Sequence, residues 1–226
     1  MTIEYGQFCP VAKAAEILGE RWTLLVVREL LLGTTRFSDL QKALPKASPT
    51  ILAKRLKELQ SAGLIRQRKA TALRRADYQL TRSGQALAGV IEQIGTWAER
   101  WAPSRLAQKD LDEYFLMLDI SRRMDLAALP LEAATIGVRL RASAGEPHWW
   151  LVVRDGRADL CDRDPGFEID LLVSGPLRAV VGVWLGRESL HAARRAGTIT
   201  VTGNAALARS MERWLGYSAF ARGVRA

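Results

Sequence analysis

The sequence predicts an α+β chain made of two domains that meet near residue 105. Amphipathic helical patterns dominate residues 1–104, whereas short alternating strand patterns and helices share residues 105–226. The type of basic residue changes at the same place, because the last lysine is Lys109 and every later base is arginine. A chain of 226 residues is long enough for two ordinary domains. We therefore expect one domain over residues 1–104 and a second over residues 105–226.

The positive charge of the chain is concentrated in one short segment. Residues 36–82 contain 12 Lys and Arg against three Asp and Glu, a surplus equal to the net charge of +9 of the whole chain. The remaining bases and acids cancel. A positive field confined to one segment indicates a polyanionic partner, most simply double-stranded DNA.

The composition also bounds the cellular setting. Cys9 and Cys161 are too few for a disulfide framework, and the first ten residues lack the basic and apolar regions of a signal peptide. No apolar run approaches the roughly 18 residues that span a bilayer. We expect a cytoplasmic protein with no membrane partner.

Two helices open the first domain. Proline suits the first position of a helix, so Pro10 predicts a helix start, and the apolar stripe that follows ends at Gly19. A second helix runs from about Trp22 to Leu32. Its apolar content is nearly continuous, which predicts the central core helix of this domain.

A pair of short helices follows. Ser38 and Gln41 have the spacing of a capping box, which predicts a helix to about residue 44. Ser48 as N-cap and Pro49 at the first helical position predict another helix, which Gly63 ends. This second helix has one leucine face, formed by Leu52, Leu56 and Leu59, and one polar basic face. Two helices joined by a tight turn, the second with such a face, indicate a helix-turn-helix.

The polar face of the second helix is the expected reader of DNA. Thr50 and Lys54 are the candidates for contact with base edges, and Lys57, Arg55 and Arg36 are the candidates for contact with phosphates. The spacing of the residues sets which face of the helix they share but not how the helix lies on DNA. For each basic residue the alternative is therefore a solvent-exposed side chain that does not contact DNA. Two serines at helix starts complete the set of this region, Ser38 and Ser48.

A β-hairpin and a long helix complete the first domain. Residues 64–69 and 77–81 predict two strands around a basic loop, which is the place of a wing after a recognition helix. The wing bases expected at phosphate or in the minor groove are Arg68, Lys69, Arg74 and Arg75. Ser83 then predicts the start of a helix to about Trp101. Its broad apolar face predicts a homodimer interface, formed by Leu87, Val90, Ile91, Ile94, Trp97 and Trp101.

Residues 7–101 resemble the HxlR-type winged helix-turn-helix regulators. The resemblance is carried by Cys9-Pro10-Val11-Ala12, Leu18 to Thr23, Arg28 to Gly33, Arg36 to Leu40, Ser48-Pro49, Leu52 to Leu59, Ala62 to Ile65 and Tyr78 to Thr81. It implies a transcriptional regulator that binds an inverted-repeat operator as a homodimer. The chain departs from the family at Ala53, usually a serine, and in its longer wing loop.

The second domain resembles a different family. Alternating runs between residues 130 and 175, followed by helices and the strand Thr198–Thr202, predict a small sheet with helices. Residues 173–207, and most of all Ala196 to Asn204 with the Ala206-Leu207-Ala208 helix start, are similar to the sterol-carrier-protein-like fold. That resemblance implies a cavity for a hydrophobic or lipid-like effector. The expected lining is Trp149, Trp150, Val181, Trp184, Leu185, Leu190, Met211 and Trp214.

Other readings of the sequence stay open. Cys9 precedes a helix, where the dipole favours the reactive thiolate, so a thiol redox switch is one alternative and a buried packing residue is the other. A lipid carrier is a third hypothesis. His148 and His191 accompany no cluster with metal-ligand spacing, and there is no phosphate loop or nucleophile elbow. We therefore expect no metal, no cofactor and no enzymatic activity.

Overall fold

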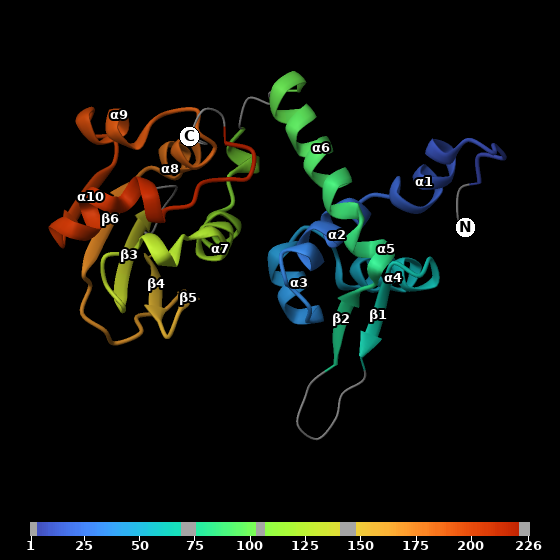
Figure 1. The fold of residues 1–226 in the computed structure, drawn as a ribbon, viewed down its shortest axis with the longest axis horizontal. Coiled ribbons are helices and arrows are strands. Elements are labelled where there is room, and N and C mark those ends of the chain that lie inside the picture. Colours follow the sequence, from blue (N-terminus) through green and yellow to red (C-terminus); the bar gives the residue numbers. More distant parts are fainter. Residues whose placement is uncertain (1–3, 69–75, 103–106, 141–147, 222–226) are drawn as a thin grey trace. The chain divides into compact units, whose positions relative to one another are not determined.

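The computed structural model describes residues 4–68, 76–102, 107–140 and 148–221. The chain forms two compact units, Met1–Pro103 and Ser104–Ala226 (Figure 1). Helices and a β-sheet occur in both units, so the predicted α+β class is confirmed.

The first unit is built around one helix. Its elements are α1 (Pro10–Leu18), α2 (Thr23–Leu31), α3 (Phe37–Ala43), α4 (Pro49–Ser61), β1 (Ile65–Arg68), β2 (Asp77–Leu80), α5 (Arg82–Gln85) and α6 (Leu87–Trp101). Helix α2 contacts α3, α4, α6 and β2. Val26, Val27 and Leu30 place its apolar face in the core, as the continuous hydrophobic pattern predicts.

The ends of α4 follow the sequence, but the start of α3 does not. The Ser48 hydroxyl accepts a hydrogen bond from the Ile51 N–H at 3.3 Å, which is the predicted N-cap. Gly63 follows α4 with φ +70°, a conformation that favours glycine. The capping box at Ser38 and Gln41 is wrong. Ser38 lies inside α3, and the Gln41 amide instead donates to the Ala47 carbonyl at 2.7 Å, which closes the turn before α4.

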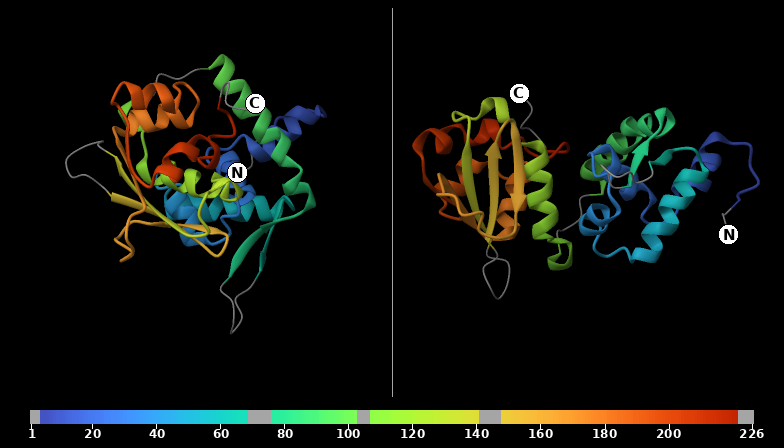
Figure 2. Two further views of the ribbon diagram at one scale, coloured as in Figure 1. Left: turned by 60° about the vertical axis from the view of Figure 1, so that its left-hand side comes forward. Right: turned by 90° about the horizontal axis from the view of Figure 1, so that it is seen from below.

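The hairpin β1–β2 is antiparallel, with Ile65 opposite Leu80, and it extends away from the helices in Figures 1 and 2. The Tyr78 N–H donates to the Thr35 carbonyl at 2.8 Å, which attaches β2 to the segment before α3. The next helix starts earlier than predicted, because Thr81 rather than Ser83 caps it by accepting from the Gly84 N–H at 3.2 Å.

The second unit contains one five-stranded sheet. Its elements are η1 (Gln108–Asp110), α7 (Glu113–Arg123), η2 (Leu126–Ala128), β3 (Ala134–Leu140), β4 (His148–Arg154), β5 (Arg157–Cys161), β6 (Leu171–Gly175), α8 (Leu177–Trp184), α9 (Leu190–Arg195), β7 (Thr200–Gly203) and α10 (Ala205–Trp214). The strand order is β5-β4-β3-β6-β7, with β3 and β6 parallel and the other pairs antiparallel.

Asp170 fixes the point at which three strands meet. Its carboxylate accepts from the Thr135 N–H at 2.8 Å, its N–H donates to the Thr135 carbonyl at 2.9 Å, and its carbonyl accepts from the Asn204 N–H at 2.7 Å. These bonds join the starts of β3 and β6 to the end of β7. Asp170 is therefore a structural carboxylate.

The helices of the second unit cover one face of the sheet (Figure 2). Helix α7 is held there by two tryptophans whose indole N–H groups donate to its carboxylates. Trp184 on α8 donates to Asp119 at 3.0 Å, and Trp149 on β4 donates to Glu113 at 3.4 Å. Burial raises the pKa of Glu113, which the Trp149 bond partly opposes.

Gly216, in the segment that follows α10, packs closely against the end of α7. It has φ +78°, and a Cβ at this position would lie 1.7 Å from the Arg123 carbonyl oxygen. We expect Gly216→Ala to lower the free energy of unfolding by about 3 kcal/mol or more in urea titrations, since the backbone must move. Gly182→Ala in α8, where a Cβ meets nothing within 4 Å, should instead stabilise by about 1 kcal/mol. Equal effects of the two changes would contradict this packing.

Candidate functional site

The exposed face of α4 is the first candidate site. Leu52, Leu56 and Leu59 are at most 1% exposed and point into the core of the first unit. A helix advances about 100° per residue, so this burial turns the opposite side of α4 outward. The side chains there are Thr50, Lys54, Lys57 and Ser61, and all four are exposed. Short polar and basic side chains on a protruding helix suit the major groove of DNA.

Three more predicted residues lie at helix starts. Arg36 and Ser38 are exposed at the start of α3, and Ser48 is exposed at the N-cap of α4. The positive end of the α4 dipole lies at Ser48, so the backbone there favours an anion. Ser48 and Thr50 thus share the first turn of α4.

Arg55 departs from the prediction. Its side chain is 8% exposed and lies in a network of ion pairs rather than on the outer face. Its guanidinium pairs with Glu20 at 2.6 Å and with Glu58, and its Nε donates to the Arg21 carbonyl at 3.0 Å. The flank of α4 on which Arg55 lies is covered by the segment that joins α1 to α2. Arg55 is therefore held by partners within the protein and does not project from the outer face of α4.

Of the four basic residues predicted for the wing, the structure describes only Arg68. Arg68 at the end of β1 forms a two-bond ion pair with Asp77 on β2, at 2.9 and 2.7 Å. This cross-strand pair neutralises the arginine locally and raises its pKa. The other predicted wing bases, Lys69, Arg74 and Arg75, lie outside the described residues.

The apolar face of α6 is divided between two uses. Leu87 and Ile91 are partly buried and pack against the core of their own unit. Val90 and Ile94 are each 44% exposed, Trp97 is 60% exposed and Trp101 is 65% exposed. The exposed part of the apolar face is thus largest toward the end of α6.

An apolar cavity of about 30 Å³ lies between the sheet and the helices of the second unit. Four of the predicted residues line it: Trp184, Leu190, Met211 and Trp214. Nine other lining residues were not foreseen, and four of them lie on strands, namely Ile136, Val138, Leu151 and Val173. The alternation along these strands is the signal that would have found them. Every lining residue is apolar, so the cavity has no group that would bind a charge.

The remaining predicted pocket residues do not line the cavity. Trp149 points toward α7, where its ring lies 6.0 Å from that of Tyr114. Trp150 pairs with Gly137 across β3 and β4 and so faces the opposite side of the sheet from Leu151. Val181 lies on α8 and Leu185 is the C-cap of that helix, and neither contributes to the cavity wall.

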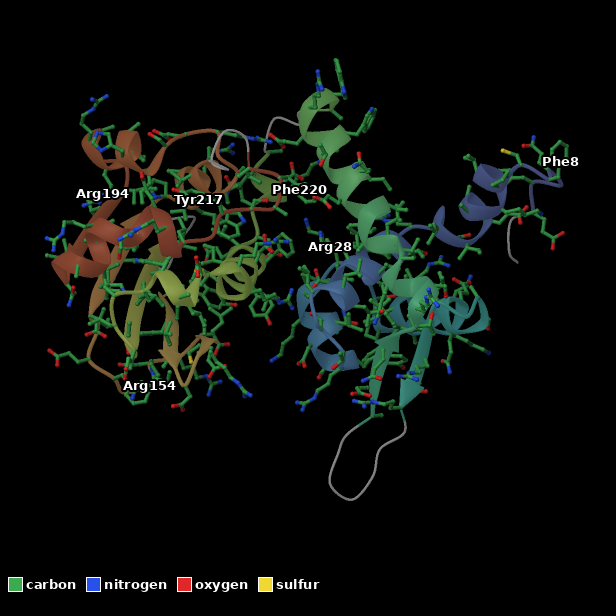
Figure 3. The ribbon with its side chains drawn as sticks, in the orientation of Figure 1. Phe8, Arg28, Arg154, Arg194, Tyr217 and Phe220 are labelled. Atoms are coloured by element: carbon green, nitrogen blue, oxygen red, sulfur yellow. The ribbon has the colours of Figure 1, made fainter. Side chains whose placement is uncertain are left out.

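Cys9 occupies the N-cap of α1, ahead of Pro10. The Cys9 side chain makes no cap hydrogen bond, but the backbone N–H groups of Ala12 and Val11 at the start of α1 favour the thiolate and lower the pKa of the thiol. Helix α1 has no buried residue, and Phe8 beside the cysteine is fully exposed (Figure 3). Cys161 on β5 differs, because burial, with help from Asp159 and Asp162, raises the pKa of its thiol. Cys9 is only partly buried, and these features favour a reactive thiol over a buried packing residue.

Among the residues that the structure describes, no three or more His, Cys, Asp or Glu side chains gather as metal ligands would. Within the same ranges, no helix has the length and apolar character needed to cross a membrane.

A helix-turn-helix with an exposed basic helix, a following hairpin and a separate sheet unit defines a winged-helix transcriptional regulator with an added domain. Comparison with known sequences identifies both parts. Residues 17–106 match the family described as HxlR-like helix-turn-helix, and residues 118–216 match the SCP-2 sterol transfer family. The chain belongs to the HxlR-like family of transcriptional regulators and carries an SCP-2 domain after its winged helix.

Relatives in Bacillus subtilis match the first unit. The HTH-type transcriptional regulator YvaP is 40% identical over 98 residues, which are 42% of this chain and 91% of YvaP. The regulator YodB is 34% identical over 95 residues, which are 41% of this chain and 85% of YodB. The structure of reduced YodB is 31% identical over 43% of this chain and 99% of that one, with a TM-score of 0.39.

The two cysteines should differ in reactivity. The thiolate is the species that reacts with iodoacetamide, and the lowered pKa of Cys9 enlarges its thiolate fraction near neutral pH, whereas the raised pKa of Cys161 reduces it. We expect Cys9 to be alkylated first between pH 7 and 8, as measured by peptide mass spectrometry over time. Cys9→Ser and Cys161→Ser identify the two phases. Faster labelling of Cys161 would contradict the assignment.

Proposed function

We propose that this regulator binds an inverted-repeat operator as a homodimer, and that its second unit binds a hydrophobic small molecule that controls DNA binding. In this proposal residues 1–104 bind DNA and dimerise, and residues 105–226 bind the effector. The observation that carries the DNA part is the outward basic face of α4, whose direction the three buried leucines determine.

The DNA-contacting residues divide into two groups. Thr50 and Lys54, on the outer face of α4, would contact base edges. Lys57 and Arg36 would contact phosphates, together with Ser38, Ser48 and the wing bases Lys69, Arg74 and Arg75. Arg55 is left out, because its guanidinium is buried and ion-paired.

The homodimer is supported by the exposed apolar side chains of α6. Trp97 and Trp101, with Val90 and Ile94 one or two turns earlier, form a surface that water would otherwise cover. The exposed Val11 and Ile17 of α1 add a second apolar surface on the same unit. A twofold dimer would present two α4 helices to half-sites roughly 34–36 Å apart.

The effector part rests on the apolar cavity and on the SCP-2 match. A cavity of about 30 Å³ holds far less than a drug-sized ligand, whose pockets are about 300–1,000 Å³. Binding therefore requires the helices to move away from the sheet. Such a ligand controls DNA binding only through different affinities for the DNA-competent and incompetent states.

Lys57→Ala and Thr50→Ala should have different effects on DNA binding. Loss of a phosphate contact weakens binding to all sequences and lowers the slope of log K against log salt by about 0.9. Loss of a base contact changes the preferred site instead. A duplex recovered by selection from a random library, and a scrambled duplex of the same length, are titrated by fluorescence anisotropy. Arg209→Ala, an exposed base of the second unit, is the matched control and should bind both as wild type does.

Native mass spectrometry tests the effector. Protein isolated from its own cells should carry an apolar molecule that organic solvent removes. Val183→Phe, which places a ring in the cavity, should lose that molecule while the variant protein still binds the selected duplex. Retention of the molecule by Val183→Phe would contradict the cavity as its site. A molecule that is carried without any change in DNA affinity would favour the lipid-carrier hypothesis for this unit.

A second candidate is redox control through Cys9, which its lowered thiol pKa favours. Diamide treatment should then weaken binding of the wild type to the selected duplex and leave Cys9→Ser unchanged. Equal loss in the two proteins would remove Cys9 from the mechanism.

A further inference from the structure

Arg55 joins the recognition helix to the segment that enters the domain. Its three guanidinium nitrogens each have a partner: Nη2 pairs with Glu20 at 2.6 Å, Nε donates to the Arg21 carbonyl at 3.0 Å, and Nη1 pairs with Glu58. Glu20 and Arg21 belong to the junction between α1 and α2, whereas Glu58 lies on α4 itself. One buried side chain thus connects two elements that are 34 residues apart in the sequence.

The junction that Arg55 holds has a strained backbone. Trp22 has φ +79°, in the left-handed region that a tryptophan adopts only where its surroundings hold it. The Arg21 carbonyl that Arg55 holds belongs to the peptide unit immediately before Trp22, so any rotation about φ of Trp22 moves it. The Arg21 guanidinium in turn lies 5.1 Å from the centre of the Trp22 ring. Arg55 therefore restrains the residue at which the chain turns from α1 into α2.

Helix α1 is poorly fixed by its own packing. None of its residues is buried, and Val11 and Ile17 remain exposed. A cleft of about 470 Å³ separates α1 from α4, with Glu16 and Ile17 on one side and Lys57 on the other. A helix with this little burial changes position when a partner covers it, and the junction at Glu20 and Arg21 moves with it.

At its other end the network reaches a DNA-reading side chain. Glu58 accepts from Arg55 and also lies 3.8 Å from the Lys54 ammonium, one turn earlier on α4. The order of contacts is Glu20, Arg55, Glu58 and Lys54. A shift of Glu20 changes the partners of Arg55, and Glu58 is then free to draw Lys54 away from its outward position.

We propose that Arg55 is a positioning residue that ties α4 to the strained α1–α2 junction, so that the placement of α1 sets how selectively α4 reads DNA. This inference rests on the proposed DNA contacts of α4. The network connects Glu20, next to the end of α1, with Lys54 on α4 through Arg55 and Glu58. A planar guanidinium is required, since a lysine ammonium cannot serve three acceptors in this geometry.

Glu20→Gln separates positioning from simple electrostatics. Removal of a negative charge near a DNA surface strengthens binding to every duplex, so electrostatics alone predicts equal or tighter binding. Our proposal predicts that the ratio of affinities for the selected and scrambled duplexes falls about tenfold, within the range of couplings measured inside one ion-pair network. Glu16→Gln is the matched control. Glu16 lines the same cleft, but its carboxylate accepts hydrogen bonds from the Tyr5 N–H and the Lys13 ammonium. Its affinity ratio should equal that of the wild type.

Arg55→Lys provides the second measurement. It keeps the charge but not the fork, so we expect the same loss of selectivity with an unchanged salt slope. In Arg55→Gln, which removes the charge, a slope lower by about 0.9 than that of the wild type would show that Arg55 contacts phosphate directly, and this would overturn the proposal. Wild-type selectivity in both Glu20→Gln and Arg55→Lys would also overturn the proposal. The salt slope of Lys57→Ala would show in the same experiment whether α4 contacts DNA. Loss of selectivity in Glu16→Gln would overturn the specific role of Glu20. A wild type that binds both duplexes equally would contradict the proposed function as well.

Discussion

The packing of three leucines of α4 against α2 determines the orientation on which the DNA-facing surface depends. Leu52, Leu56 and Leu59 are almost completely buried, and each contributes about 1.5–3 kcal/mol relative to exposure. Rotation of α4 by one residue would expose them and bury charged side chains. The outward direction of Thr50, Lys54 and Lys57 is therefore a consequence of core packing. The turn before α4, closed by Gln41 and Ala47, and the cap at Ser48 set where that face begins.

The charge of the first unit is divided between recognition and structure. The sequence shows a block of bases that all suit a polyanion, but two arginines of its described part form ion pairs within the protein. Arg55 pairs with Glu20 and Glu58, and Arg68 pairs with Asp77 across the hairpin. These ion pairs reduce the positive charge that α4 and the hairpin present to a partner, and they restrain the conformations of both elements. The bases that remain on the outer face of α4 are few, which favours selective contacts over general attraction.

The second unit follows a different physical logic. Its sheet is aligned by main-chain bonds at Asp170, and α7 is attached to it by carboxylates that accept from tryptophan indoles. The Trp184–Asp119 bond is buried, whereas the cavity between sheet and helices is lined by aliphatic and aromatic side chains. Trp149 and Trp184 both use the indole N–H to hold α7, but only Trp184 also lines the cavity.

The sequence by itself determined the α+β class, the order of the elements and several of the helix ends in the first unit, because caps, glycines and hydrophobic periodicity act between residues close in the chain. It also determined the outward face of α4, since the leucine spacing is local. The tertiary structure decided what depends on distant partners: the ion pairs that bury Arg55, the packing of Leu87 and Ile91 against their own core, and the strand residues that help to line the cavity. A basic side chain on the flank of a helix has the same local pattern whether it meets solvent or a carboxylate 35 residues away. Only the packing of α1 and α2 beside α4 distinguishes the two cases.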